Sequence, residues 1–587
     1  MLDTQKSNDW PRITIEDGMK ILTDVPITMA DGVVLRADIY LPVAEGRHPL
    51  IASLGAYGKN LPFSEPPYAG MWATLVDNYP DSLDNTSAKH TSFEVADPEH
   101  WVPHGYGVMR IDSRGAGRSQ GVMNTHSLQE SIDYAACIEW ASQQPWSNGK
   151  VGLSGISYFA VNQWLVASLK PNGLAALFIW EGCSDWYREA AYHGGIPCTF
   201  LGDWYNVQAK TVQHGLGSRG KKNPYTGMQV SGDVDLTDEE LAANRVDVAG
   251  TLAAHPFDDE FYRLRSADHS RIEVPLISLG NWGGQGLHGR SNLKGFVDAG
   301  SQHKYLEVHG REHWTLYYTR YYRDLQLRFF DCYLKGQGDW ETSQPKVLLQ
   351  IRHPGEKFVS RAEQEWPLAR TEWTRLYLHP AARDLRWSPP GQDEQASYEG
   401  FGEGLTLRTS PLSEPVEITG PIQAKIFISS ETTDADLFLV LRVFDPRGRE
   451  VLFHGANEPK APIAQGWLRA SHRKLDPLRS RSWMPYHPHQ EEEPLVPGQV
   501  YELDIEIWPT CLVVPAGYVI ALSVLGRDFD HGLPGPTSHL GTPLRGCSFF
   551  LHGGRPEETY GKSVTIHSGP DYPSYVVLPV IPGGIPA

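Results

Sequence analysis

Cysteine is scarce in this sequence, and the few cysteines form no metal-binding or redox motif. All six are scattered over 587 residues without a C-x-x-C pair. We therefore expect free, buried thiols and neither a disulfide framework nor a zinc site. No apolar run approaches the roughly 18 residues that a membrane-spanning helix requires. Residues 1–10 are polar and lack the apolar core of a signal peptide. These absences favour a location in the cytoplasm.

Positive charge is also in short supply. The chain has 52 Lys and Arg residues against 70 Asp and Glu residues, which gives a formal net charge of −18. Nucleic acids and anionic membranes repel an acidic chain, and no run of Lys or Arg suggests a local exception. We therefore predict a small-molecule substrate and no nucleic-acid or membrane partner. Whether the chain forms a homo-oligomer stays open.

Apolar runs alternate with helical periodicity in the first part of the chain. Short apolar runs at 49–54 and 107–111 each end in a Gly-rich loop. Residues 127–144 then have helical periodicity, and a further apolar run follows at 150–153. Alternation of this kind predicts a mostly parallel sheet with helices on both faces.

The alternation is interrupted between residues 184 and 270. This stretch mixes polar, aromatic and glycine residues with short acidic helical segments, which suits a helical cap inserted over a pocket. The sheet pattern then resumes and closes with an amphipathic helix over 320–335, stopped by Gly336. We therefore predict one core formed by residues 1–183 and 271–365, with the cap at 184–270.

A different pattern begins at about residue 366. Short strand-like runs, such as 422–428, 438–444 and 501–507, are separated by Pro, Gly and Asp turns, with almost no helical signal. This pattern is typical of an all-β sandwich or jelly roll. We predict a C-terminal jelly-roll domain over residues 366–587.

The strongest chemical signal is a serine at a strand-to-helix turn. Residues 151–156 have the pattern of a strand, and a helical stretch begins directly after Ser157. This is the nucleophile elbow of an α/β-hydrolase, in which a strained turn lifts the serine Oγ above the sheet. The strict G-x-S-x-G motif fails because position 159 is Phe, and G-x-S-x alone also occurs in ordinary turns. We predict Ser157 as the nucleophile and Ser154 as a structural neighbour.

Six segments of the chain resemble one known family. Gly155-Ile156-Ser157-Tyr158 resembles its elbow, and residues 110–121 resemble its D-x-R-G-x-G-x-S-x-G loop. The other matches lie at 31–42, 329–336, 412–421 and 507–510. The family is that of cocaine esterase and X-prolyl dipeptidyl peptidase, which includes α-amino-acid ester hydrolases and β-lactam acylases. The resemblance spans nearly the whole chain and implies an α/β-hydrolase with an inserted cap and a C-terminal jelly roll.

The same resemblance implies roles for the groups around Ser157. A tyrosine after an early strand supplies an oxyanion donor in this family, and Tyr57 takes that place here, beside the backbone amide of Tyr158. Alignment with the family's G-x-x-H places the general base at His313. His309 lies within the preceding strand, and we expect it to be a packed histidine.

The acid of the triad is where this sequence departs from the family. The family carries Asp four residues after a strand-ending Gly, and that position is Gly284 here. Our first hypothesis gives the role to Glu181, at the end of another strand, where active residues of α/β folds gather; a salt bridge to the cap is its alternative. A second hypothesis gives it to Gln285 or a water, with slower turnover. A third holds that hydrolysis is lost. Glu312 is predicted to point away.

Aromatic residues of the cap and its surroundings are candidates for the substrate pocket, although they could equally form the core of the cap. Our predicted substrate-binding residues are Trp186, Tyr187, Trp204 and Trp282. Asp185 is expected to be structural. His487 and His489 lack a third ligand, so no metal site is predicted there.

We predict a serine hydrolase that cleaves a carboxylic ester through an acyl-enzyme. One alternative is an amide hydrolase of the X-prolyl peptidase or β-lactam acylase type, and another is an acyltransferase. A non-catalytic protein on the same scaffold is the alternative from a different class, motivated by Gly284. No cofactor and no metal are implied.

Overall fold

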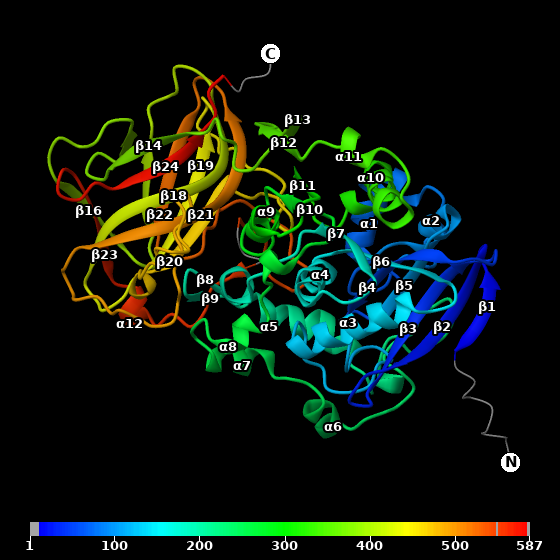
Figure 1. Cartoon of the computed structure of the whole chain (residues 1–587). Helices are drawn as coiled ribbons and strands as arrows, with labels where there is room; N and C mark the ends of the chain where they lie inside the picture. Colours follow the sequence, from blue (N-terminus) through cyan, green and yellow to red (C-terminus); the bar gives the residue numbers. More distant parts are fainter. Residues whose placement is uncertain (1–10, 547–549, 584–587) are drawn as a thin grey trace.

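The computed structural model describes residues 11–546 and 550–583, whose strands fall mainly into two eleven-stranded sheets (Figure 1). Residues 1–10, where we predicted no signal peptide, and Cys547 lie outside the described residues. No helix in the described part of the chain combines the length and apolarity needed to cross a membrane.

The first sheet is parallel in its centre and antiparallel at its edges. In spatial order its strands are β1 (Arg12–Glu16), β2 (Met19–Thr28), β3 (Val34–Pro42), β5 (Gly107–Asp112), β4 (His48–Gly55), β6 (Ser147–Ile156), β7 (Leu174–Trp180), β10 (Leu276–Asn281), β11 (Lys304–His309), β12 (Val347–His353) and β13 (Lys357–Glu363). The strands from β5 to β12 in this order run parallel to one another. Their carboxyl ends therefore meet along one edge of the sheet.

Helices cover both faces of this sheet, because the central strands are apolar on both sides. Leu177 and Ile179 of β7 join the apolar cluster of α3 (Leu128–Ser142) and α4 (Tyr158–Leu169). Phe178 and Trp180 join the cluster that contains residues of α1, α2 and α10. The remaining helices of this part are α1 (Ala69–Asn78), α2 (Pro98–Trp101), α9 (Gly289–Asp298), α10 (Arg320–Phe330) and α11 (Trp340–Ser343).

The segment predicted as a helical cap contains short helices joined by turns. Its elements are β8 (Tyr192–His193), β9 (Ile196–Pro197), α5 (Phe200–Trp204), α6 (Asp238–Ala243), α7 (Val248–Ala254) and α8 (Glu260–Arg263). Side-chain caps begin the last three of these helices, at Thr237, Asp247 and Asp259. Glycines with positive φ, including Gly215, interrupt the stretch before α6.

The second sheet closes on itself. In spatial order its strands are β16 (Glu394–Glu399), β23 (Ser563–Ser568), β18 (Val416–Ser430), β21 (Tyr501–Val514), β20 (Ala464–Arg469), β19 (Asp436–Phe444), β22 (Val519–Leu525), β17 (Leu405–Arg408), β15 (Asp384–Arg386), β14 (Glu372–His379) and β24 (Tyr575–Val580). Helix α12 (Glu557–Tyr560) lies in the connection before β23. Because β24 also pairs with β18, the strands enclose an aliphatic core.

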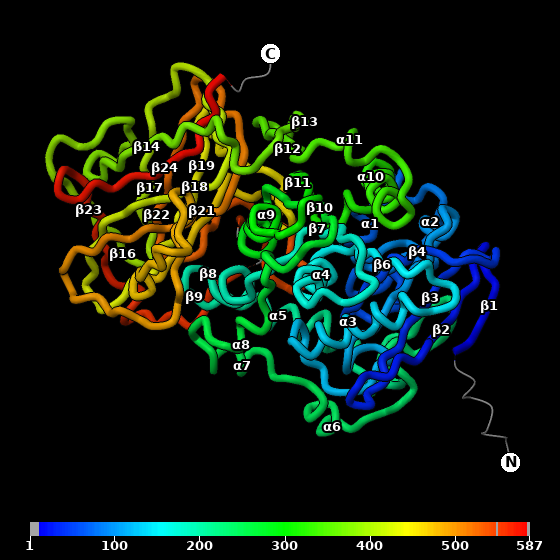
Figure 2. The backbone as a smooth tube through the Cα atoms, in the orientation of Figure 1, coloured from blue at the N-terminus to red at the C-terminus, as the bar shows by residue number. Residues whose placement is uncertain are grey.

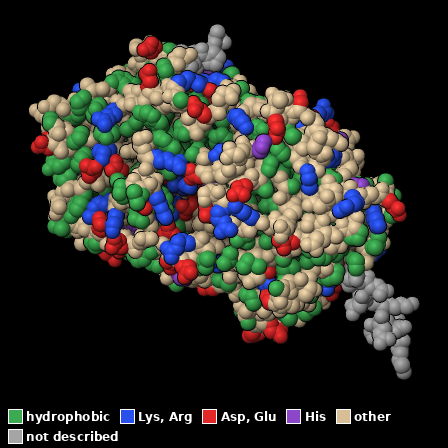
Figure 3. All heavy atoms as spheres, viewed as in Figure 1, with side chains coloured by type: hydrophobic (Ala, Val, Ile, Leu, Met, Phe, Trp, Pro, Cys, Tyr) green, Lys and Arg blue, Asp and Glu red, His purple; other side chains and the backbone are tan. Residues whose placement is uncertain are grey.

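The two domains lie side by side, with β1 and β24 on opposite sides of the molecule (Figure 2). On the face shown in Figure 3, basic and acidic side chains are interspersed. An apolar cluster joins the domains and includes Trp282, Ile351 and Val513.

Loops of the two domains also touch backbone to backbone. The amide of His313 donates to the carbonyl of Ala456 (3.1 Å), and the amide of Ala456 donates to the carbonyl of Gly283 (3.2 Å). A Cβ atom on Gly283 would lie 2.2 Å from Cα of Gly455, so this approach requires glycine at position 283. The jelly roll thus fixes two loops that follow the strands of the first sheet.

Candidate active site

Ser157 stands on a strained turn between β6 and α4. Its backbone has φ 52° and ψ −111°, a conformation that side-chain-bearing residues rarely adopt. A Cβ atom on Gly155 would lie 2.5 Å from Cβ of Phe159 and 3.0 Å from the carbonyl oxygen of Glu94. The ring of Phe159 lies over Gly55, where a Cβ atom would meet it at 2.5 Å. Gly55 therefore provides the close approach that the missing glycine at 159 would have given.

The imidazole in contact with Ser157 belongs to His288. Its Nε2 lies 3.2 Å from Oγ of Ser157. His288 is 2 % exposed, in the loop between β10 and α9. Burial, and then the neighbouring His313, lower the pKa of His288 well below its usual value, so the ring is neutral and can accept a proton. We did not predict this residue, although its loop is the one expected to carry the missing acid.

His313, the predicted base, lies behind His288. The two rings are stacked with centroids 5.7 Å apart and planes 24° apart. Nε2 of His313 lies 3.4 Å from Oε1 of Glu94. Its Nδ1 has no hydrogen-bond partner among the described residues, and burial lowers the pKa of His313 to about 3. The structure thus gives the predicted nucleophile a different hydrogen-bond partner from the one that we expected.

Glu181, the predicted acid, faces His309 instead of His313. Oε1 of Glu181 lies 3.4 Å from Nε2 of His309 and accepts a hydrogen bond from Nδ2 of Asn281 (3.2 Å). The expected contact between Glu181 and His313 is therefore wrong. Glu181, Asn281 and His309 stand at the carboxyl ends of the adjacent strands β7, β10 and β11, so their side chains meet at the same edge of the sheet. His313 lies four residues beyond its strand. Burial raises the pKa of Glu181 well above its usual range.

His309 is packed and buried, as its place in β11 suggests. Its ring lies 4.5 Å from that of Trp180, and its Nδ1 is 3.0 Å from the carbonyl oxygen of Gly310. Glu312 accepts hydrogen bonds from Tyr79 and Thr315 and lies 3.3 Å from His454.

Tyr57 and Tyr158 lie beside Ser157. The hydroxyl of Tyr57 accepts a hydrogen bond from Nε1 of Trp204 (2.8 Å), which leaves its own hydrogen available to a ligand. Burial raises the pKa of Tyr57 well above its usual value, so the phenol stays protonated. The amide of Tyr158 opens α4, where first-turn amides lack helical partners, and it faces the carboxyl of Glu94, whose pKa it lowers. The side chain of Tyr158 instead donates to Glu130 (2.6 Å).

A small pocket, with a cavity volume of about 30 Å³, opens onto Ser157. Trp186 and Trp204 line it, as predicted for a substrate pocket, together with Tyr57, His126, Tyr158, Val161, Cys183, Ala190, Phe200, Leu201, Leu287 and His288. The other two predicted residues lie elsewhere. Tyr187 stacks on Tyr192 within the cap. Trp282 donates to the carbonyl of Gln350 and packs on Trp366 at the junction of the domains.

Gln285 and Asp185 have structural contacts. The side chain of Gln285 bonds to Trp282, Pro509 and Gln465, which ties its loop to the jelly roll. Asp185 pairs with Arg188, as expected for a structural residue. Neither side chain forms a hydrogen bond with Ser157 among the described residues.

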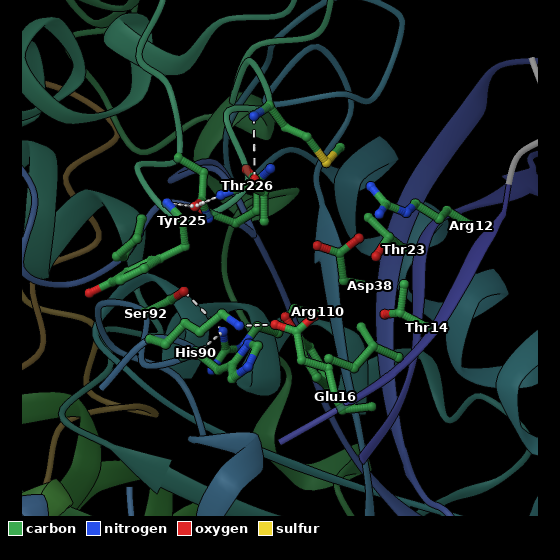
Figure 4. Close-up of a pocket in the computed structure, with 17 residues that line it drawn as sticks. Arg12, Thr14, Glu16, Thr23, Asp38, His90, Ser92, Arg110, Tyr225 and Thr226 are labelled. Atoms are coloured by element: carbon green, nitrogen blue, oxygen red, sulfur yellow. Dashed lines mark hydrogen bonds and ion pairs between the residues drawn. The ribbon is translucent and has the colours of Figure 1, made fainter. Parts of the chain in front are cut away.

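A larger pocket, with a cavity volume of about 260 Å³, is lined by residues of β1, β2 and β3 and not by Ser157; Figure 4 shows it. It contains none of the predicted site residues and mixes basic Arg12 and Arg110 with acidic Asp38. At its rim, Glu16, Asp17 and His90 bring carboxylate and imidazole atoms within 4.8 Å of one another. Lys89 forms ion pairs with both acids, so an amine already balances their charge.

The chain matches a solved structure over nearly its full length. A hydrolase of the CocE/NonD family from Staphylococcus aureus is 32% identical, with a TM-score of 0.82, over 96% of this chain and 94% of that chain. This chain belongs to the CocE/NonD family of hydrolases. The predicted family, and the α/β-hydrolase fold followed by a jelly roll, are confirmed.

Two further comparisons agree with this membership. Residues 31–315 match the model of X-Pro dipeptidyl-peptidase (S15 family), and residues 339–577 match that of its C-terminal non-catalytic domain. The cocaine esterase of a Rhodococcus species is 23% identical over 97% of this CocE/NonD hydrolase and 100% of its own length. A Mycobacterium bovis protein with the provisional name serine esterase is 26% identical over 86% of this chain and 90% of its own.

Proposed function

We propose that this protein hydrolyses a carboxylic ester through an acyl-enzyme on Ser157. The observation that carries the proposal is the 3.2 Å contact between Oγ of Ser157, on its strained turn, and Nε2 of a neutral His288. A serine hydroxyl becomes a nucleophile when a neighbouring base takes its proton. The hydroxyl of Tyr57 and the backbone amide of Tyr158 supply the two donors that an oxyanion requires.

The reaction has two halves. Oγ of Ser157 attacks the ester carbonyl while His288 takes its proton, and Tyr57 and the amide of Tyr158 hold the oxyanion. The C–O bond to the alcohol then breaks, and His288 returns the proton to the departing oxygen. Water then attacks the acyl-enzyme while His288 takes its proton. The bond between the acyl carbon and Oγ of Ser157 breaks, His288 returns the proton to Oγ, and the acid leaves.

The pocket favours an uncharged ester over a peptide with a free amino terminus. Among the described residues that line the pocket of Ser157, none is acidic, and most are aromatic or aliphatic. A substrate ammonium group buried there would lack a carboxylate to compensate its lost hydration. The X-prolyl peptidase activity in the name of the matched family model is therefore our second candidate.

The proposal is tested with p-nitrophenyl esters of two to eight carbons and with an X-Pro p-nitroanilide. We expect turnover of the esters, and labelling of Ser157 by a fluorophosphonate identified by peptide mass spectrometry. Ser157→Ala should lower kcat by about 10⁴-fold or more. Ser154→Ala is the matched control, because that hydroxyl lies in β6, three residues before Ser157, but bonds to Tyr317 and Gln326.

Each alternative has its own outcome. Faster turnover of the anilide supports the peptidase, and new esters formed with added alcohols support an acyltransferase. A folded protein without turnover, in which Ser157 stays unlabelled, is a non-catalytic member of the family.

We also propose that the protein acts in the cytoplasm on a small molecule. Its five described cysteines are all free thiols, and four of them are buried. Thiols persist in a reducing compartment, whereas disulfides form in secreted proteins. Activity found only in a secreted fraction of the source cells would contradict this location.

A further inference from the structure

Glu94 is a buried carboxyl beside Ser157 that the proposed mechanism leaves without a role. The residue is 2 % exposed, and its Oε2 has no hydrogen-bond partner in the described part of the chain. Nor does any Lys or Arg among the described residues form an ion pair with it; its one ion-pair contact is the 3.4 Å approach to His313. A buried carboxyl without a basic partner is costly, so its presence beside the nucleophile turn calls for an explanation.

The backbone around Glu94 is attached to the nucleophile turn. The carbonyl of Glu94 accepts from the amide of Ile156 (2.9 Å), and Val95 forms a β-bridge with Gly155. Arg110 holds the same segment from both sides, through hydrogen bonds to the carbonyls of His90 (2.7 Å) and Ala96 (2.6 Å). Glu94 itself has φ 65°, a left-handed conformation that non-glycine residues seldom adopt. These contacts fix the strained backbone of Glu94 in place. Strained backbone that is fixed in this way is typical of functional sites.

We infer that Glu94 is a positioning residue for the hydrolytic reaction: it holds His313 against His288 and supplies the negative charge that the imidazolium needs. It thereby stands in for the acid that position 284 lacks. The inference rests on the proposed function. Proton transfer from Ser157 leaves a positive charge on His288, and His313 with its carboxylate lies directly behind that ring. A fixed carboxylate in a water-poor site stabilises such a charge far more than it would in water.

This role gives the reaction a distinct pH dependence. Burial, and then the carboxyl of Glu181, raise the pKa of Glu94 well above its usual range, while the amide of Tyr158 lowers it. The side chains that share its surroundings are Tyr57, Tyr68, Glu181, His313 and Tyr318. Since only the carboxylate can stabilise an imidazolium, activity should rise as pH rises through the pKa of Glu94. The pKa of His288 lies well below 6.5 and limits the rate only at lower pH.

The test is the Glu94→Gln variant of the full-length enzyme, assayed with the best p-nitrophenyl ester. We expect kcat to fall roughly 10²-fold with KM changed less than threefold, because the carboxylate acts on the transition state and not on substrate binding. The acid limb of kcat/KM should also move to lower pH, since the histidines alone then limit it. A residue that only supported the fold would lower the active fraction but leave this limb in place.

Glu307→Gln is the matched control. Glu307 is also a buried carboxyl, 1 % exposed. Burial raises its pKa to about 7, but it lies in β11 against Tyr321 and Tyr322. We expect its kcat and pH profile to match the wild type.

Two further variants keep the inference testable where Glu94→Gln is poorly folded. Glu94→Asp retains the carboxylate one methylene further back, so its kcat should lie between those of Gln and Glu. Glu94→Gln combined with His313→Asn should be no slower than His313→Asn alone, because residues that act through one another are not additive.

The inference is overturned when Glu94→Gln keeps wild-type kcat and pH profile while the wild type turns over ester and is labelled at Ser157. It is equally overturned when Glu181→Gln loses as much kcat as Glu94→Gln. A wild type that neither hydrolyses ester nor reacts at Ser157 contradicts the proposed function itself, which is a separate result.

Discussion

The carboxyl edge of the first sheet and the interior of the jelly roll both bury charged side chains, but they pair them differently. In the jelly roll, Asp436 receives two hydrogen bonds from Arg469, at 2.8 and 3.0 Å. Along the edge of the first sheet, buried carboxyls meet neutral histidines and keep unpartnered atoms. Atoms without a hydrogen-bond partner near the predicted site include Oε2 of Glu94, Oε2 of Glu181, Nδ1 of His288, Nε2 of His309, Nδ1 of His313 and both ring nitrogens of His126.

Backbone strain is also present at the predicted site. Ser157, the predicted nucleophile, has positive φ, and so do Glu94 and Glu181 beside it; in the jelly roll, Arg383 and His489 have positive φ as well. A polar network that is fully paired rigidifies a fold, whereas unpaired groups and strain are retained where a site must bind or react. Unpaired groups and strained backbone thus occur together around the predicted nucleophile, where we propose the chemistry.

Of the variants that test this comparison, we expect the largest loss of kcat at His288. His288→Gln should lower kcat by roughly 10³-fold, because the serine loses its proton acceptor. His313→Gln should lower it less, because Ser157 keeps its hydrogen-bond partner. Steady-state kinetics of the two variants with one ester measure the difference. A larger loss in His313→Gln would restore His313 as the base that we predicted from the sequence.

The next effect concerns stability in the jelly roll. Asp436→Asn removes the nearer carboxylate of the buried guanidinium of Arg469 and leaves only Asp434, 3.9 Å away, at a cost of about 3 kcal/mol. Thermal unfolding followed by tryptophan fluorescence should show a lower midpoint, while kcat and KM of the remaining folded enzyme stay unchanged. A loss of kcat in folded Asp436→Asn would show that this ion pair of the jelly roll also serves the reaction.

The smallest effect expected is at Tyr57. Tyr57→Phe removes one oxyanion donor and should lower kcat by roughly 30-fold, near 2 kcal/mol, with KM little changed. Because the hydroxyl accepts a hydrogen bond from Trp204, Trp204→Phe is the control for a merely displaced ring. Equal losses in both variants would assign the effect to packing of the pocket.

Local patterns made much of the fold and the nucleophile predictable from the sequence. Ser157 follows a strand and precedes a helix within a dozen residues, so its turn is encoded locally. Strand alternation likewise marks the jelly roll, because each inner residue faces the same aliphatic core. The cap was harder to predict, since its short helices owe their stability to caps and to tertiary packing.

The partners of Ser157 were not encoded locally. His288 lies in a Gly-rich loop whose path depends on Gly283 meeting Gly455 of the other domain. Glu94 lies in a segment with little regular structure, and its approach to the nucleophile turn comes from Arg110 and from the bridge between Val95 and Gly155. Glu181 has the expected position at a strand end, but its neighbour is decided by the order of strands β7, β10 and β11.

The hydrogen bond from His313 to Ala456 has a consequence for engineering and for evolution. The domain matched as non-catalytic supplies the anchor for a loop of the catalytic one. A chain truncated after β13 would therefore lose activity even where its own sheet folds. For the same reason, chimeras that exchange substrate preference between relatives should be active when both domains come from the same parent. The loop and the residues that anchor it then match.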